Sequence, residues 1–121
     1  MAEQRMTEEP VARVLLAVQQ VPAGRVATYG DIGAVTGVGA RRVGAILAQH
    51  GSTVPWWRVV GHDGVLAPLK EARGYWAAEG IRVRADGRGC TIAAYRADFF
   101  QMAADYVVAA RDLGWDLPQP R

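Results

Sequence analysis

The sequence predicts a single, mostly helical domain with a small amount of β-structure. Three observations lead to this prediction. Apolar residues recur at helical spacing near both ends of the chain, in residues 10–20 and 98–113. Glycine and proline divide the region between them into short segments. The 121 residues, 50% of them hydrophobic, suffice for one domain with a moderate core.

Composition narrows the class of protein. No apolar run approaches the ~18 residues that cross a bilayer. The acidic residues Glu3, Glu8 and Glu9 argue against a signal peptide, and we expect residues 1–9 to form a flexible leader. The single cysteine, Cys90, excludes an internal disulfide and suits a reducing compartment. We therefore expect a cytoplasmic protein without a membrane segment, and separately we expect a monomer.

The positive charge is concentrated in one part of the chain. The net charge is only +2, but residues 11–60 contain five arginines and a single acid, Asp31, which gives 5 − 1 = +4. This distribution is compatible with a polyanionic partner, although charge alone favours a solvated basic face.

The first helices are delimited by turn and capping residues. The apolar positions of residues 10–20 predict an amphipathic helix that starts at Pro10, where a first-turn proline is tolerated. Thr28 followed by Asp31 resembles a capping box and predicts a helix to about Thr36. Glycines at 37 and 39 end that helix, and a second follows over 40–49. Two short helices joined by a glycine turn are typical of a helix-turn-helix.

The second half of the chain predicts hairpins and two further helices. A strand over 57–60, a tight turn at 62–64 and a return at 65–66 form a wing-like hairpin. A helix follows over 68–79. Residues 81–84 and 90–94 flank a glycine-rich turn and predict a second hairpin, and Asp98 caps a last helix that ends near residue 114. The predicted fold is a winged helix-turn-helix domain with a hairpin-plus-helix extension.

Residues with reactive side chains give little support for catalysis. His50, His62 and Cys90 are too far apart in sequence to suggest a metal site, and no phosphate-binding or dinucleotide-binding glycine motif is present. We expect neither a metal nor a cofactor. Trp56 and Trp57 are consecutive and precede Arg58, and an exposed indole beside arginine suits base stacking. Burial of both indoles in the core is the alternative.

Three motifs together resemble one family. They are residues 22–32 (PAGRVATYGDI), 40–44 (ARRVG) and 55–60 (PWWRVV). In this order and spacing they are similar to the DNA-binding domain of the O6-alkylguanine-DNA alkyltransferases, over roughly residues 10–83. In those enzymes the third motif carries the cysteine that accepts the alkyl group, and Trp56 occupies that position here. Tryptophan at this position is typical of alkyltransferase-like proteins, which bind the lesion without repairing it.

The resemblance implies roles for individual residues. Tyr29 is similar to the tyrosine that crowds the target phosphate and helps to rotate the nucleotide outward. Arg41 is similar to the arginine finger that fills the vacated base stack. The implied lesion pocket consists of Tyr29, Pro55, Trp56, Trp57, Arg58 and Val59, with Val60 shaping the wall. The implied DNA-backbone and recognition-helix residues are Thr28, Ala40, Arg42 and Gly44.

Two departures from the family pattern concern the pocket. The histidine that activates the cysteine in the enzymes is Trp57 here, which reinforces a role without catalysis. Glu79 resembles the acid of the same proton relay. The loop after the wing lacks an arginine that some relatives place against the lesion, and Lys70 is the candidate to replace it. Residues 84–121 lie beyond the resemblance, and we expect them to pack on the domain.

Three functions fit these residues to different degrees. The favoured one is a sensor that binds O6-alkylguanine in double-stranded DNA by base flipping and flags it for nucleotide excision repair proteins. The second is a winged helix-turn-helix transcriptional regulator that reads base edges, although a regulator needs no such pocket. The third is an alkyltransferase that uses Cys90, which lies in the wrong motif.

Overall fold

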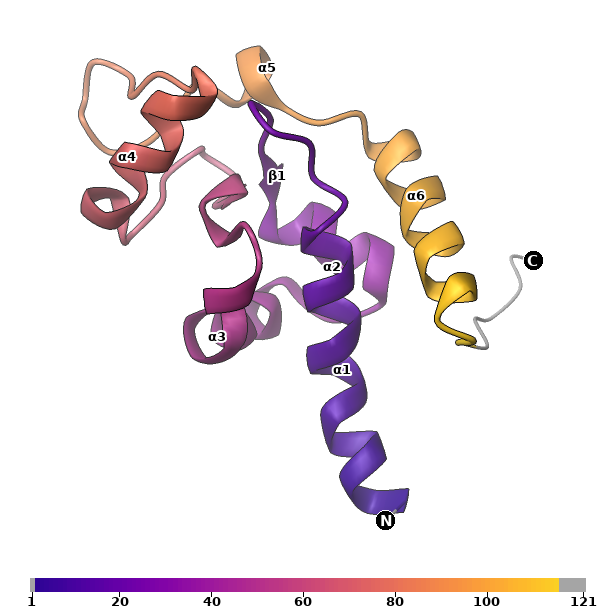
Figure 1. Cartoon of the computed structure of the whole chain (residues 1–121). Helices are drawn as coiled ribbons and strands as arrows, with labels where there is room; N and C mark the ends of the chain where they lie inside the picture. Colours follow the sequence, from indigo (N-terminus) through magenta and orange to yellow (C-terminus); the bar gives the residue numbers. More distant parts are fainter. Residues whose placement is uncertain (1, 116–121) are drawn as a thin grey trace.

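The computed structural model describes residues 2–115 as a mostly helical fold with one small sheet (Figure 1). The helices are α1 (Ala2–Val18), α2 (Tyr29–Thr36), α3 (Ala40–His50), α4 (Leu69–Glu79), α5 (Ile92–Tyr95) and α6 (Phe99–Asp112). Two short 3-10 turns, η1 (Gly51–Thr53) and η2 (Trp56–Arg58), and two strands, β1 (Ala27–Thr28) and β2 (Val59–Val60), complete the elements. The predicted fold class is confirmed. No described helix is long and apolar enough to span a bilayer.

The first helix begins earlier than the sequence predicts. The prediction started the helix at Pro10, whereas α1 runs from Ala2 and contains Pro10 in its interior. The prediction was wrong because it used the proline as a boundary, although the preceding residues are mainly Ala, Glu, Gln, Arg and Met, which are among the strongest helix formers. Proline removes one hydrogen bond to the previous turn without ending the helix. The start of α1 projects away from the rest of the molecule (Figure 1).

The predicted helix-turn-helix pair is confirmed as α2 and α3. The Thr28 hydroxyl accepts the Asp31 N–H at 2.9 Å, and the Asp31 carboxylate accepts the Thr28 N–H at 3.1 Å, which completes the capping box. Gly37 ends α2 with φ 80°, a conformation that favours glycine. Gly33 permits the close approach of the connecting turn, because a Cβ there would lie 2.5 Å from the Val38 carbonyl oxygen.

The predicted wing is wrong in its pairing. β2 pairs in parallel with β1, with Ala27 opposite Val59, and not with the returning segment. Residues 61–64 do form the predicted tight turn, but Val65 bridges to Gly89, and the Cys90 N–H donates to the Gly64 carbonyl at 3.1 Å. One bond of the predicted hairpin does form, from the Gly61 N–H to the Val65 carbonyl at 2.9 Å, but the returning segment finds further hydrogen bonds in a part of the chain that local turn signals do not reveal.

Of the second predicted hairpin, only the turn between residues 84 and 89 forms within the described residues, and the returning strand does not. The Arg84 N–H donates to the Gly89 carbonyl at 2.8 Å, but residues 92–95 form helix α5 in place of a strand. The backbone of Val26 forms two hydrogen bonds at the end of this helix: its N–H donates to the Tyr95 carbonyl at 2.9 Å, and its carbonyl accepts the Ala97 N–H at 2.8 Å. The last helix, α6, begins at the predicted Asp98 cap.

The buried side chains form two hydrophobic clusters. The first joins α1, α2, α3 and α6 and includes Val14, Ile32, Val43 and Met102. The second lies around α4 and contains Val26, Val60, Leu66, Leu69, Ala72, Trp76, Ile81 and Cys90. The segment after residue 84 contributes to both clusters, through Cys90 in one and through α6 in the other. It is therefore part of the packed fold as far as residue 115.

Candidate nucleic-acid interface

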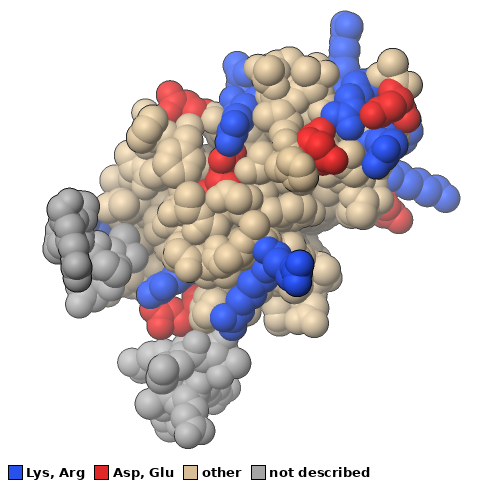
Figure 2. Space-filling model, turned by 180° about the vertical axis from the view of Figure 1, so that it is seen from behind, with Lys and Arg blue, Asp and Glu red and all other residues tan. Residues whose placement is uncertain are grey.

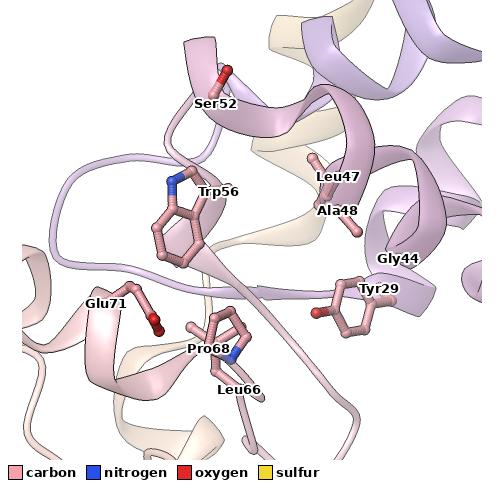
Figure 3. A pocket seen from close by; sticks show the side chains of 9 residues that line it. All are labelled: Tyr29, Gly44, Leu47, Ala48, Ser52, Trp56, Leu66, Pro68 and Glu71. Carbon is pink, nitrogen blue, oxygen red and sulfur yellow. The ribbon is translucent and has the colours of Figure 1, made fainter.

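An open pocket of about 420 Å³ lies where the two clusters meet (Figure 3). One side, here called the helical wall, consists of four residues of α2 and α3: Tyr29, Gly44, Leu47 and Ala48. The opposite side, the loop wall, consists of Ser52, Trp56, Leu66, Pro68 and Glu71. Most of these side chains are apolar, and such a lining suits the flat face of an aromatic ligand.

Tyr29 dominates the helical wall. It is the first residue of α2, directly after the Thr28 cap, and its ring lies against Gly44, where an added Cβ would stand 3.9 Å from the tyrosine Cε1. Its hydroxyl points into the pocket (Figure 3). Burial raises the pKa of the Tyr29 phenol above its ordinary value, which keeps the hydroxyl protonated at neutral pH. The hydroxyl can therefore donate a hydrogen bond to a group in the pocket.

Trp56 supplies the aromatic surface of the loop wall. Its indole meets Trp57 edge-on, with ring centroids 5.9 Å apart and an interplanar angle of 84°, and meets Tyr75 at 6.1 Å and 75°. Trp57 and Tyr75 are themselves stacked, 3.9 Å apart and 10° from parallel. Edge-to-face and stacked pairs are the favoured aromatic geometries. The stacked pair therefore supports Trp56 from behind and leaves it facing the pocket.

A polar network anchored on Glu79 holds η2 in place. The Glu79 carboxylate accepts the Trp57 indole N–H at 3.0 Å, the Gly24 N–H at 3.0 Å and three bonds from Arg58, of which the shortest is 2.7 Å. The Trp57 carbonyl accepts the Trp76 indole N–H at 2.7 Å. Burial acts to raise the pKa of Glu79, but the hydrogen bonds from Arg58, Gly24 and Trp57 outweigh it and lower the pKa below its ordinary value.

Of the six residues expected in the pocket, two line it and four do not. Tyr29 and Trp56 line the cavity on opposite walls, but Pro55, Trp57, Arg58 and Val59 do not. The expectation came from the family resemblance, and the sequence predicted an extended strand over 57–60. The 3-10 turn η2 instead directs Trp57 and Arg58 toward Glu79, while Val59 is fully buried in the first cluster.

The residues expected at the DNA backbone also separate into groups. Ala40, Arg41 and Arg42 are exposed at the beginning of α3, where the first turn carries no acidic residue, and neither arginine forms an ion pair with another described residue. Free N–H groups and the helix dipole make such an end attractive to anions. Thr28 is a buried cap, and Gly44 lines the pocket.

On the face seen in Figure 2, basic side chains gather mainly at one end of the molecule. Figure 2 shows them at the end of the molecule that carries α4, α5 and the loop between them, interspersed with acidic side chains. Lys70 belongs to α4 and is exposed, but it does not line the pocket, so the structure gives no support to its role as a substitute for the missing arginine. The predicted basic block is also partly neutralised internally, since Arg13 pairs with Glu9 and Arg58 with Glu79.

Sequence reasoning missed several residues of the site. It named Gly44 only as a recognition-helix residue and missed Leu47 and Ala48, although these three residues follow i, i+3, i+4 spacing and share one face of α3. Glu71 in the first turn of α4 gave no such signal. Arg96 was also missed: its guanidinium donates to Asp31 at 2.6 and 3.1 Å and ties the C-terminal segment to the cap of α2. Burial acts to raise the pKa of Asp31, but the hydrogen bonds from Arg96 and Thr28 lower it.

Cys90 is separated from the pocket. It is fully buried in the second cluster and is not among the lining residues. Burial raises the pKa of its thiol above the ordinary value, which lowers the fraction of the reactive thiolate. This environment is typical of a structural cysteine.

Comparison with known proteins gives consistent matches. Residues 9–83 match the family described as the 6-O-methylguanine DNA methyltransferase DNA-binding domain. The chain is 36% identical over 96 residues to a DNA base-flipping protein of Escherichia coli K12, covering 71% of this chain and 74% of that protein. A DNA base-flipping protein of Vibrio parahaemolyticus is 33% identical over 86 residues, covering 64% of this chain and 86% of the relative.

Solved structures agree with these sequence matches. The crystal structure of Schizosaccharomyces pombe Atl1 with DNA containing O6-carboxymethylguanine superposes with a TM-score of 0.67 at 26% identity, covering 75% of this chain and 96% of that chain. A second structure of the S. pombe protein with DNA gives a TM-score of 0.62 at 26% identity, covering 81% and 97%. The expected resemblance to the alkyltransferase-like proteins is thereby confirmed.

Proposed function

Because this chain belongs to the family of the 6-O-methylguanine DNA methyltransferase DNA-binding domain, we propose that it binds duplex DNA and holds an O6-alkylated guanine in the pocket without repairing it. The observation that carries the proposal is the placement of Tyr29 and Trp56 on opposite walls of one apolar cavity. Relatives named for DNA base flipping and a neighbour solved with damaged DNA support the same function.

The pocket has the properties that an extruded alkylated base requires. Extruding a base costs a few kcal/mol of stacking and pairing, which interactions in the protein must recover. The indole of Trp56 offers a flat apolar surface to the base, and the Tyr29 hydroxyl offers a hydrogen bond from the facing wall. A cavity of about 420 Å³ is within the range of sites for small aromatic ligands.

The start of α3 is the proposed contact with the duplex. Arg41 would enter the base stack and fill the space left by the extruded base, since a guanidinium can stack and donate hydrogen bonds at once. Arg42 and the free N–H groups of the first turn would contact phosphates. In this arrangement α3 would contact the duplex with its first turn and forms part of the helical wall with later residues, so that one helix serves both the duplex and the pocket.

The same residues argue against transfer of the alkyl group. Trp56 lines the pocket, and an indole is not a nucleophile comparable to a thiolate that could accept the alkyl group as its bond to guanine O6 breaks. The adjacent Trp57 donates its only N–H to Glu79 and cannot act as a base. We therefore propose that the bound lesion remains intact and that the complex flags it for nucleotide excision repair.

Equilibrium binding to two matched duplexes tests the proposal. One duplex carries guanine and the other O6-methylguanine at the same position, and binding is measured over a series of salt concentrations. We expect about tenfold tighter binding to the lesion, and affinity for both duplexes should fall steeply as salt rises. Equal affinity at every salt concentration would exclude a lesion sensor and favour a regulator that reads unmodified DNA.

Two variants locate the preference in the pocket. Trp56→Ala removes the stacking surface and should abolish most of the preference for the lesion duplex. Phe100→Ala is the matched control, because Phe100 is an aromatic residue that is 83% exposed on α6 and does not line the pocket. The pocket is not the lesion site if Trp56→Ala folds normally and retains the wild-type preference.

A further inference from the structure

The pocket contains one charged side chain. Of the nine described residues that line it, Glu71 alone carries a charge, and none of them is lysine or arginine. Glu71 belongs to the first turn of α4, and its carboxylate points toward the space between Trp56 and Pro68 (Figure 3). A glutamate side chain is negatively charged at neutral pH, so the loop wall presents a negative charge to whatever the pocket holds.

This charge is not neutralised within the described residues. The other acidic groups close to the site are paired, Glu79 with Arg58 and Asp31 with Arg96, whereas Glu71 forms no ion pair in the described part of the chain. The pocket side chains around it are mostly apolar, among them Trp56, Leu66 and Pro68. Glu71 is itself exposed, so water screens part of its charge, but at a separation of a few ångströms a carboxylate still repels an anionic group.

From this arrangement we propose that Glu71 determines specificity: the pocket accepts neutral or cationic O6-adducts of guanine and discriminates against anionic ones. The inference rests on the proposed function. An alkyl group on O6 extends from the edge of the base, and an anionic group there would meet the carboxylate of Glu71 without a basic residue among the lining side chains to offset the repulsion. A neutral adduct of the same size would not be penalised.

A pair of adducts that differ only in charge isolates this effect. The probes are matched duplexes carrying O6-carboxymethylguanine, which is anionic, or O6-carbamoylmethylguanine, its neutral amide of nearly equal size. Phosphate contacts are the same for both, so the ratio of the two dissociation constants reports on the adduct alone. For the wild-type protein we expect the anionic adduct to bind roughly tenfold more weakly than the amide.

Substitutions at position 71 should change this ratio in a set order. Glu71→Gln keeps the size of the side chain and should bring the ratio close to one, and Glu71→Lys should reverse it. Asp112→Asn is the control, because it makes the same change in net charge on exposed α6, away from the pocket, and should leave the wild-type ratio unchanged. Far-ultraviolet circular dichroism and thermal melting confirm that each variant is folded.

Three results would overturn the inference. A wild-type ratio near one would show that Glu71 does not discriminate, and an unchanged ratio in Glu71→Gln would assign the discrimination to another group. An equal change in Asp112→Asn would show a general charge effect. These results leave the proposed function intact as long as both lesion duplexes bind more tightly than unmodified DNA. If neither does, the proposed function fails and the inference fails with it.

Discussion

The two walls of the pocket are held by different kinds of interaction. The helical wall is supported by local features: the capping box at Thr28 and the buried residues Val43 and Ile46 on the inner face of α3. The loop wall is supported by contacts between distant parts of the chain, in which Glu79 joins Gly24, Trp57 and Arg58. The helical wall is therefore held mainly by packing between two helices, whereas the loop wall is held mainly by polar contacts between distant segments.

This difference separates two functions that share one cavity. The helical wall adjoins the arginines proposed to contact DNA. Its residues belong to the two helices of the helix-turn-helix. The loop wall carries Trp56 and Glu71, which we propose determine what the pocket binds and what it rejects. Substitutions in the network should therefore disturb the loop wall first, and substitutions in the helix pair should disturb DNA contact.

The largest effect is expected from removal of the network anchor. Glu79→Ala leaves the largely buried Arg58 side chain, 16% exposed, without its carboxylate partner and removes the acceptor of the Trp57 indole. We expect the free energy of unfolding to fall by ~3 kcal/mol. Urea denaturation at neutral pH measures it. Glu71→Ala on the same helix is the control and should change stability by less than ~0.5 kcal/mol.

Equal stability of the Glu79→Ala and Glu71→Ala variants would contradict the role given to the network. It would mean that η2 is positioned by aromatic packing alone, through the stack of Trp57 on Tyr75.

A smaller loss is expected at the helix pair. Gly33→Ala places a Cβ 2.5 Å from the Val38 carbonyl oxygen, so the backbone of the connecting turn must shift, at ~2 kcal/mol. Gly44→Ala provides the matched control on α3, since its nearest contact would be Tyr29 Cε1 at an ordinary 3.9 Å. Thermal denaturation compares the two variants. A Gly33→Ala protein as stable as Gly44→Ala would show that the turn tolerates displacement.

The arginines at the start of α3 should differ in their effect on lesion binding. Arg41→Ala removes the proposed finger and should weaken binding to O6-methylguanine DNA roughly tenfold, whereas Arg42→Ala, a phosphate contact, should weaken it roughly threefold. A fluorescent base analogue opposite the lesion should report less flipping only for Arg41→Ala. The assignment of the two roles is reversed if Arg42→Ala proves the more damaging.

The smallest effect concerns acid stability. The pKa of Glu79 and that of Asp31 are both lowered in the folded protein, so the unfolded chain binds more protons in acid. Their contribution is complete above the unfolded pKa and is lost as the pH falls from about 5 toward 3. Glu79→Gln should flatten this dependence by less than ~1 kcal/mol. Urea denaturation at a series of pH values would contradict the assignment if wild type and variant lost stability in parallel.

The sequence predicted the helical half of the fold because its determinants are local. The Thr28 capping box, the glycine that ends α2 and the Asp98 cap of α6 are each contained within a few residues. The pairing of β2 with β1, and of Val65 with Gly89, brings together residues more than twenty positions apart. Turn signals favour neighbouring segments, so they predicted hairpins where the chain forms longer connections.

In the candidate site, too, features that depend on long-range packing were not predicted correctly. Family resemblance placed Tyr29 and Trp56 in a pocket, and the structure puts both there. It also placed Trp57 and Arg58 there, but these two side chains donate hydrogen bonds to Glu79. Charge-assisted hydrogen bonds to a carboxylate are stronger than the contacts that an open cavity offers. Glu71 could not be predicted, since only the packing of α4 against the loop brings it to the pocket.

The fate of the methyl group is the most direct test of recognition without repair. The protein is incubated with an excess of O6-methylguanine duplex at a concentration that saturates binding, and the same sample is divided. Intact mass spectrometry is applied to the protein, and the modified base is quantified in the recovered DNA. We predict an unchanged protein mass and full recovery of O6-methylguanine. A protein heavier by one methyl group, with a matching loss of the lesion from the DNA, would contradict the account.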